Sequence, residues 1–211
     1  MANNNGSIKE IRKKVTSTYE LISTSYHEAG HTVYALLNCQ KVDFVNVYEN
    51  KKTKRIDGLT CYHSPDLSEI DKETDPGFLI SALEIEVGTK YAGLTAEKFH
   101  FKKMSGSDKF PLYWRDGSSD DTKDAAYLIK RFSPVTPGRK RYAYKKKIIK
   151  RTFTLLEQHW DAVTLVAHAL VQKKRLDFSE LKDLLTKKSE DKEFWKDRFK
   201  DIADIFGNPR T

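Results

Sequence analysis

The segment HEAGH, from His27 to His31, combines residue types and a spacing that suit metal-dependent hydrolysis. Residues four positions apart lie one turn apart on the same face of a helix, so His27 and His31 can present imidazole nitrogens to one metal ion. Zinc accepts such ligands at about 2 Å from each nitrogen. Glu28 can take a proton from a water molecule that attacks a carbonyl polarised by the ion. The three residues therefore form a minimal hydrolytic site.

The alternative is that two histidines share a helix face by chance. With this composition, two His and one Glu at these positions arise in roughly one chain in a hundred of this length. Two small residues, Ala29 and Gly30, fill the middle of the motif. Because a glycine inside a helix costs about 1 kcal/mol relative to alanine, Gly30 indicates that another backbone approaches closely here. The low chance frequency of the motif and the glycine in its middle both favour the zinc site.

A hydrolytic zinc site has three protein ligands and one open position for water, so a third ligand is needed. The extended motif H-E-x-x-H-x-x-G-x-x-H does not supply it, because Tyr34 and Leu37 occupy the positions of its glycine and third histidine. The ligand must come from a more distant part of the chain. Spacing alone leaves as candidates Glu84, Glu86, Glu97, His63, His100 and the pair Asp120 and Asp121.

Hydrophobic periodicity predicts the elements that position these residues. Apolar side chains recur at three- and four-residue steps from Thr18 to Leu37, which predicts a helix of about twenty residues around HEAGH. Alternating residues predict a two-stranded β-ribbon. The predicted strands cover residues 42–49 and 58–63, and the further helices cover 78–101, 121–132, 141–173, 177–185 and 190–206. The predicted fold is therefore mainly α, with about six helices and a small two-stranded ribbon. Residues 1–16 are expected to be a disordered or frayed lead-in, and 17–206 a single domain.

Composition restricts the class of protein. The chain has 211 residues, of which 38% are hydrophobic, and this is typical of a globular protein. Cys39 and Cys61 are too few for a disulfide framework, and no run of about 18 apolar residues predicts a membrane span. Neither GxxxxGK[ST] nor GxGxxG occurs, which excludes the usual phosphate-cradling nucleotide sites. We therefore expect a soluble, cytoplasmic protein.

The net charge of +8 is concentrated in one segment. Residues 139–151, RKRYAYKKKIIKR, contain eight basic residues and no acidic one. One interpretation is a solvated helix with an apolar side. The others are a surface for an anionic membrane, an acidic partner protein or nucleic acid. Peripheral association with a membrane or binding of an anionic partner is preferred over nucleic acid.

Several stretches, in the same order, resemble the peptidase domain of the FtsH family, the AAA-linked zinc metalloproteases of bacteria, mitochondria and chloroplasts. The stretches are YHEAGHTV, VDFVNVYE with DGLTCY, YAGLTAEKF, GSSDDTKDA and TLLEQHWDAVTLVAHALVQKKRLDFSELKDLL, which together span about residues 19–185. The resemblance implies an FtsH-protease-like fold and a zinc metalloendopeptidase of the HExxH type. In the family, the aspartate of the fourth stretch is the third zinc ligand, and residue by residue it falls on Asp121. His27, His31 and Asp121 are thus the expected metal ligands, with Glu28 as the catalytic base.

Two further carboxylates are candidates for supporting roles. A zinc-binding histidine usually donates its outer nitrogen to a carboxylate or carbonyl, and Glu97 could accept this hydrogen bond or could be an ordinary surface residue. Asp120 stands where the family has asparagine. It could tune the metal site, although a role in capping the following helix is favoured.

The family's members carry an ATPase domain before the peptidase and usually a membrane anchor, and this sequence shows neither. We therefore expect a stand-alone peptidase that hydrolyses unfolded or extended polypeptides, with a separate AAA ATPase or a homo-oligomer as further partners. Substrate would lie as an extended strand beside the ribbon, because backbone pairing does not demand a particular sequence. The alternative is a metal-stabilised, proteolytically inactive interaction module or a partner subunit of a separate ATPase. The intact Glu28 favours the enzyme.

Overall fold

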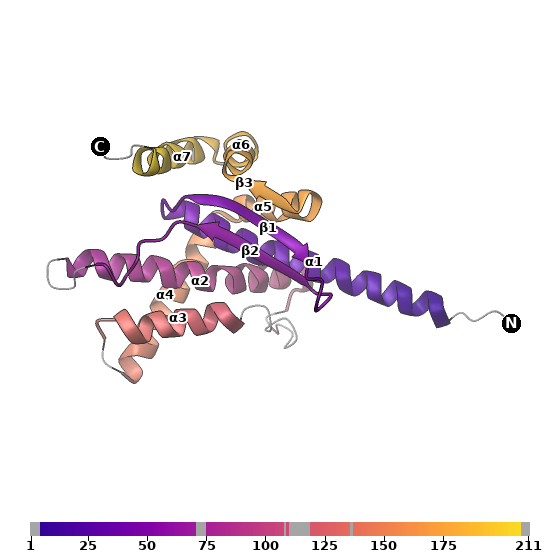
Figure 1. Ribbon diagram of the computed structural model, residues 1–211, viewed down its shortest axis with the longest axis horizontal. Helices are drawn as coiled ribbons and strands as arrows, with labels where there is room; N and C mark the ends of the chain where they lie inside the picture. The colour runs from indigo at the N-terminus through magenta and orange to yellow at the C-terminus, as the bar shows by residue number, and fades with distance from the viewer. Residues whose placement is uncertain (1–4, 71–74, 108, 110–118, 136, 208–211) are drawn as a thin grey trace.

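The computed structural model describes residues 5–70, 75–107, 109, 119–135 and 137–207, and the side chains from residue 17 onward within these ranges. The described part of the chain contains seven helices and a small antiparallel sheet, so the prediction of a mainly α fold is confirmed. Helix α1, Asn5–Leu37, is the longest element, and its N-terminal part extends beyond the other elements in Figure 1. Residues 5–16, which were expected to be a frayed lead-in, belong to this helix. Residues 1–4 lie outside the described residues.

The sheet has three strands in the order β2-β1-β3. The predicted ribbon corresponds to β1, Val42–Glu49, and β2, Ile56–Tyr62, which pair in an antiparallel register. The prediction of two strands was wrong, because the short strand β3, Arg175–Asp177, pairs with the other side of β1. A three-residue strand is too short to show an alternating pattern in the sequence. Because β1 pairs with a strand on each side, β2 lies at one edge of the sheet.

Helix α2, Pro76–Ser105, begins with clear start signals: Asp75 caps it by accepting a hydrogen bond from the backbone N–H of Phe78, and proline occupies the first turn. Helix α3, Ser119–Phe132, comes after residues 110–118, which lie outside the described residues. The predicted helix over 141–173 is two helices, α4, Arg139–Gln158, and α5, Trp160–Lys173, divided at His159. Helices α6, Phe178–Lys188, and α7, Lys192–Phe206, close the fold.

Buried apolar side chains form two clusters, and α2 contributes to both. The first joins α1, the sheet, and helices α5 to α7, and includes Ala92 and Ala96 of α2. The second joins the earlier half of α2 to α3 and α4, around Leu83, Val87 and Ile129. In Figure 1, α2 accordingly runs between α1 and α3. Helix α2 is thus the element that fixes α3 relative to α1.

The two long helices approach each other closely at Gly30. A Cβ atom at this position would lie 2.5 Å from the carbonyl oxygen of Ala92, a distance that real Cβ atoms do not reach. The close backbone approach expected from a glycine in the middle of the motif is therefore confirmed. Among the described residues, no helix is both long and apolar enough to cross a membrane.

Candidate metal centre

Helix α1 places the two histidines of the motif one turn apart on the face that packs against α2. Both are buried, with only 6% of each residue exposed. Their Nε2 atoms lie 2.9 Å apart. This is the outcome that helix geometry predicts for positions i and i+4.

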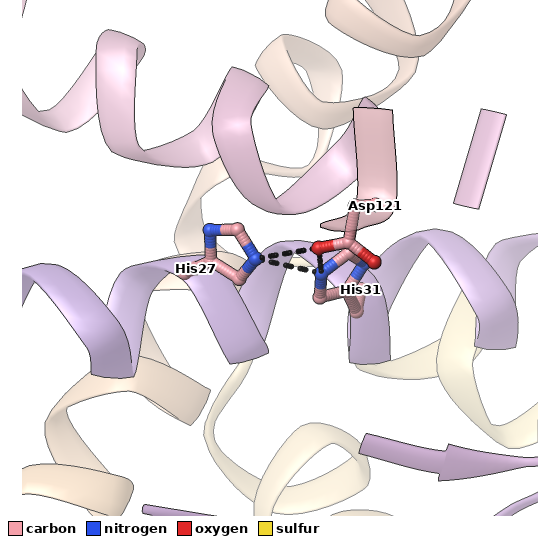
Figure 2. Close-up of side chains that lie close together, drawn as sticks. All are labelled: His27, His31 and Asp121. Atoms are coloured by element: carbon pink, nitrogen blue, oxygen red, sulfur yellow. Dashed lines mark hydrogen bonds and ion pairs between the residues drawn. The ribbon is translucent and has the colours of Figure 1, made fainter. Parts of the chain in front are cut away.

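Asp121, in the first turn of α3, brings a carboxylate to the same point. Its Oδ2 atom lies 3.1 Å from the Nε2 atom of His27 and 3.2 Å from that of His31. Figure 2 shows the three side chains converging from α1 and α3. In the described part of the chain, this is the only group of His, Cys, Asp or Glu side chains arranged to hold a metal ion. The ligand set expected from the family resemblance is therefore brought together in the structure.

The separations between the three atoms fit a tetrahedral site. In such a site, with bonds of about 2.0–2.1 Å, neighbouring ligand atoms lie about 3.3 Å apart. The observed separations of 2.9, 3.1 and 3.2 Å are close to that edge length. Three ligand atoms also leave the fourth position open. The donor set therefore fits a metal ion that retains one free position.

The outer nitrogens of the histidines determine which ring atoms face the centre. The Nδ1 atom of His31 donates to the backbone carbonyl of Thr89 over 2.7 Å, so the lone pair of a neutral ring is on Nε2. The Nδ1 atom of His27 lies 3.4 Å from Oε1 of Glu97. This contact has the distance of an ion pair but not the geometry of a hydrogen bond, since His27 Nδ1 has no hydrogen-bond acceptor among the described residues. It still orients the ring so that Nε2 faces the centre.

Glu97 is therefore in the position expected of a supporting carboxylate. It is buried, with 6% of the residue exposed, which excludes the alternative of an ordinary surface residue. The hydroxyl of Ser23 donates to its Oε1 atom over 3.2 Å. This hydrogen bond holds the carboxylate beside His27.

The charges within the cluster shift the pKa values of His27 and Asp121. Burial opposes a charge on His27, but the hydrogen bond to Asp121 and the nearby carboxylate of Glu97 outweigh it and hold the pKa of the imidazole well above its ordinary value. Burial likewise opposes a charge on Asp121, yet its contacts with both histidines hold the pKa of the carboxyl well below its usual range. A cation at the centre would compete with a proton for the imidazole of His27, so metal binding should favour proton release.

Sequence reasoning missed Gly93, which provides the space for the centre. A Cβ atom at this position of α2 would lie 2.5 Å from the Nε2 atoms of both His27 and His31. No residue other than glycine fits there without moving the ligands. The available signal was its place in the interior of a predicted helix, where glycine is unfavourable by about 1 kcal/mol.

Glu28, the expected base, faces strand β2. The hydroxyl of Thr60 donates to its Oε2 atom over 2.7 Å, and a Cβ at Gly58 would overlap the side chain of Glu28. The carboxylate lines a cavity of about 420 Å³ that the three candidate ligands also line. The remaining walls come from Thr24, Tyr48, residues 56–60, Tyr62, Lys90, Glu97 and Asp120. The candidate base and the candidate metal ligands therefore share one solvent-accessible space.

The other candidate ligands have different partners. Asp120 lies one residue before Asp121, but its side chain is 88% exposed and pairs with Lys123. It belongs to the first turn of α3, where its negative charge faces the positive end of the helix dipole. Glu84 pairs with Lys147 and Arg151 of α4, and Glu86 accepts hydrogen bonds from Tyr62 and Ser64. His63 pairs with Asp43, and His100 stacks on Tyr26.

The basic segment 139–151 forms the first part of α4 and is partly used within the fold. Besides the two pairs with Glu84, the Lys145 ammonium lies 5.1 Å from the centre of the Tyr91 ring on α2. Ile148 is buried, which gives the helix the apolar side expected of a solvated amphipathic helix. Exposed positions include Arg139, Lys140, Lys146 and Lys150.

No protein-family model matches the chain, and no match was found among curated proteins. The arrangement of His27, His31, Asp121 and Glu28 around one cavity is therefore the main observation from which a function can be inferred.

Proposed function

We propose that the protein is a zinc-dependent metalloendopeptidase that hydrolyses peptide bonds in unfolded or extended polypeptides. The observation that carries this proposal is the convergence of His27 Nε2, His31 Nε2 and Asp121 Oδ2 within 3.2 Å of one another, beside a cavity lined by Glu28. His27, His31 and Asp121 hold the metal.

Zinc is the metal that fits this donor set best. Two imidazole nitrogens and one carboxylate, with a fourth position free, form the ligand pattern of hydrolytic zinc sites. Magnesium and calcium prefer oxygen ligands and a higher coordination number. When bound, zinc would polarise the carbonyl of a peptide bond and lower the pKa of water at the site.

Glu28 acts as the general base. Its carboxylate takes a proton from water as the water oxygen bonds to the peptide carbonyl carbon. It then returns the proton to the amide nitrogen as the carbon–nitrogen bond breaks. The hydrogen bond from Thr60 holds this carboxylate towards the cavity rather than in a pair with a surface cation. Water is thus consumed, and a carboxylate and an amine are released.

The substrate is a chain in extended form. Strand β2 lies at the edge of the sheet, and its residues 56–60 line the cavity. An edge strand offers backbone groups with which an extended peptide can pair, largely independently of its sequence. A folded protein cannot present such a strand without local unfolding.

The same features support the proposal that the fold is FtsH-like. Helix α1 carries HEAGH, the sheet lies beside it, and Asp121 supplies the third ligand. A separate AAA ATPase that unfolds substrates, or further copies of this chain, are proposed partners. The exposed basic residues of α4 are a proposed surface for an anionic partner or an anionic membrane.

The decisive experiment combines metal analysis with cleavage assays. We expect the purified protein to contain about one zinc per chain and to cleave casein or a library of unfolded peptides. Glu28→Gln should retain zinc and lose cleavage, since the amide cannot accept the proton. Glu157→Gln, which makes the same change at an exposed site on α4, is the control and should behave as wild type. Equal cleavage by Glu28→Gln would refute the proposed role of Glu28. Zinc binding without cleavage by any variant would favour the inactive interaction module.

A further inference from the structure

One helix, α2, supplies the outer partners of the two histidine ligands, which are the groups that contact their Nδ1 atoms rather than the centre. The carbonyl of Thr89 accepts from His31, and the carboxylate of Glu97 faces His27. These residues and Gly93, which gives the ligands their space, recur every four positions and so lie along one face of α2. Ligand carboxylates need outer partners as much as ligand histidines do. The same helix, α2, is therefore where a partner for Asp121 should be found.

Lys90, one residue after Thr89, lies on the adjoining face of α2 and is close to Asp121. Its Nζ atom lies 3.9 Å from Oδ1 of Asp121, the oxygen that does not face the histidines. Its side chain is 24% exposed and that of Asp121 is 21% exposed, so the pair is partly shielded from water. Among the described residues, Lys90 is the only lysine or arginine within ion-pair distance of Asp121. It also lines the cavity with the three candidate ligands.

The ammonium group also contacts Asp124, one turn further along α3, at 3.5 Å from its Oδ2 atom. Asp124 is 60% exposed, so its pair with Lys90 is better solvated than the pair with Asp121. Two roles for Lys90 therefore need to be separated. It could dock α3 on α2 through Asp124, or it could orient the carboxylate of Asp121.

We propose that Lys90 is a positioning residue for Asp121, and this inference rests on the metal site of the proposed function. The ammonium attracts Oδ1 and leaves Oδ2 alone facing the two Nε2 atoms. A carboxylate without this partner can rotate and offer both oxygens to a metal, which would use the position needed by water. Through Asp121, Lys90 determines the number of ligand atoms and the affinity for metal.

The test measures metal binding rather than catalysis. Lys90→Met and Lys90→Arg are titrated with Co²⁺, whose visible absorption bands depend on the number of ligands, and their zinc affinity is measured by competition with a chelator. We expect Lys90→Met to bind zinc at least about 10-fold more weakly than wild type, the effect typical of losing an outer partner, and to change the Co²⁺ spectrum. Lys90→Arg should restore most of both properties, because it keeps the positive charge.

Two matched variants separate the roles. Lys123→Met removes a lysine from an exposed pair with Asp120 and should behave as wild type. Asp124→Asn removes the docking contact but leaves Lys90 beside Asp121, so zinc affinity should be unchanged or higher. A loss of affinity in Asp124→Asn equal to that in Lys90→Met would assign Lys90 to docking and overturn the proposal. A wild-type spectrum and affinity in Lys90→Met would also overturn it.

These outcomes are distinct from a failure of the proposed function. If wild type binds no metal, the metalloendopeptidase itself is refuted, and the role of Lys90 with it. If wild type binds zinc and cleaves peptides while Lys90→Met binds metal normally, only the role of Lys90 is refuted. Should Lys90→Met fail to fold, as judged by circular dichroism, the comparison of Asp124→Asn with wild type decides between docking and positioning, because Asp124 is largely exposed.

Discussion

Gly93 on α2 and His27 on α1 are in direct contact: a Cβ atom at Gly93 would lie 2.5 Å from the Nε2 atom of His27 and equally close to that of His31. The two helices are held at this separation by packing elsewhere, at Gly30 against Ala92. The candidate metal centre therefore depends on glycine in both helices where they come close. This relationship leads to the first prediction.

Gly93→Ala should lose metal binding while the protein still folds. The added methyl group occupies the space in which the Nε2 atoms face the metal, so the rings must rotate away. We expect zinc affinity to fall by about 100-fold or more, at or beyond the upper end of effects caused by outer partners. Gly77→Ala in the same helix is the control, because its Cβ would meet only Asp75 Oδ1 at 3.8 Å. Wild-type zinc affinity in Gly93→Ala, measured by chelator competition, would contradict the assigned geometry.

Asp121→Ala should bind zinc much more weakly than Asp120→Ala. The two aspartates are adjacent, but only Asp121 points its carboxylate at the histidines, whereas Asp120 is 88% exposed. We expect less than stoichiometric zinc after gel filtration for Asp121→Ala and His31→Ala, and about one zinc per chain for Asp120→Ala. Full zinc content in Asp121→Ala would exclude it as the third ligand.

Thr60→Val should reduce turnover without changing zinc content. Valine has nearly the shape of threonine but removes the hydroxyl that donates to Glu28 over 2.7 Å. The carboxylate then loses its orientation, and we expect kcat to fall by about 10-fold, a fraction of the 10²–10⁴ that general base catalysis typically contributes. Thr154→Val on the exposed face of α4 is the matched control. An unchanged kcat would show that Thr60 does not orient Glu28.

Stability should depend on pH in opposite ways with and without metal. Although burial favours neutral His27, its contacts with Asp121 and Glu97 hold its pKa above the unfolded value in the metal-free protein. The stabilisation from this group is therefore complete below the unfolded pKa and is lost as pH rises through the folded pKa. Asp121 has a lowered pKa, so its contribution is lost only in acid, as pH falls towards the folded value. Zinc would compete with a proton for the imidazole of His27, so its binding should strengthen as pH rises.

The rise in Tm on adding zinc should consequently be larger at pH 8.5 than at pH 6. Thermal melts with zinc and with a chelator at both pH values provide the measurement. His27→Gln, which removes a proposed ligand, should abolish the rise in Tm at both pH values, whereas His63→Gln, which changes an exposed histidine, should leave it as in wild type. An equal rise in Tm at the two pH values would contradict the coupling between proton and metal.

Features that depend only on residues close together along the chain could be predicted from the sequence. The spacing of His27 and His31 places two ligands on one face of any helix, and the periodicity from Thr18 onward required a helix there. Alternation in residues 42–49 predicted β1 for the same reason, because backbone geometry fixes which side chains share a face. The break at His159 was not predicted, since neither proline nor glycine marks it.

The sequence by itself therefore determined the helix that carries the two candidate ligands, the candidate base and, through the FtsH resemblance, Asp121 as the expected third ligand. The tertiary structure alone decided which carboxylate reaches the histidines, because Asp121 is 94 residues from His27 and is brought there by the packing of α3 on α2. It also brings Gly93, Thr60 and Lys90 into contact with the residues of the site. No local pattern marks Thr60 or Lys90 for the site, since the place of each depends on which surfaces meet when apolar side chains are buried.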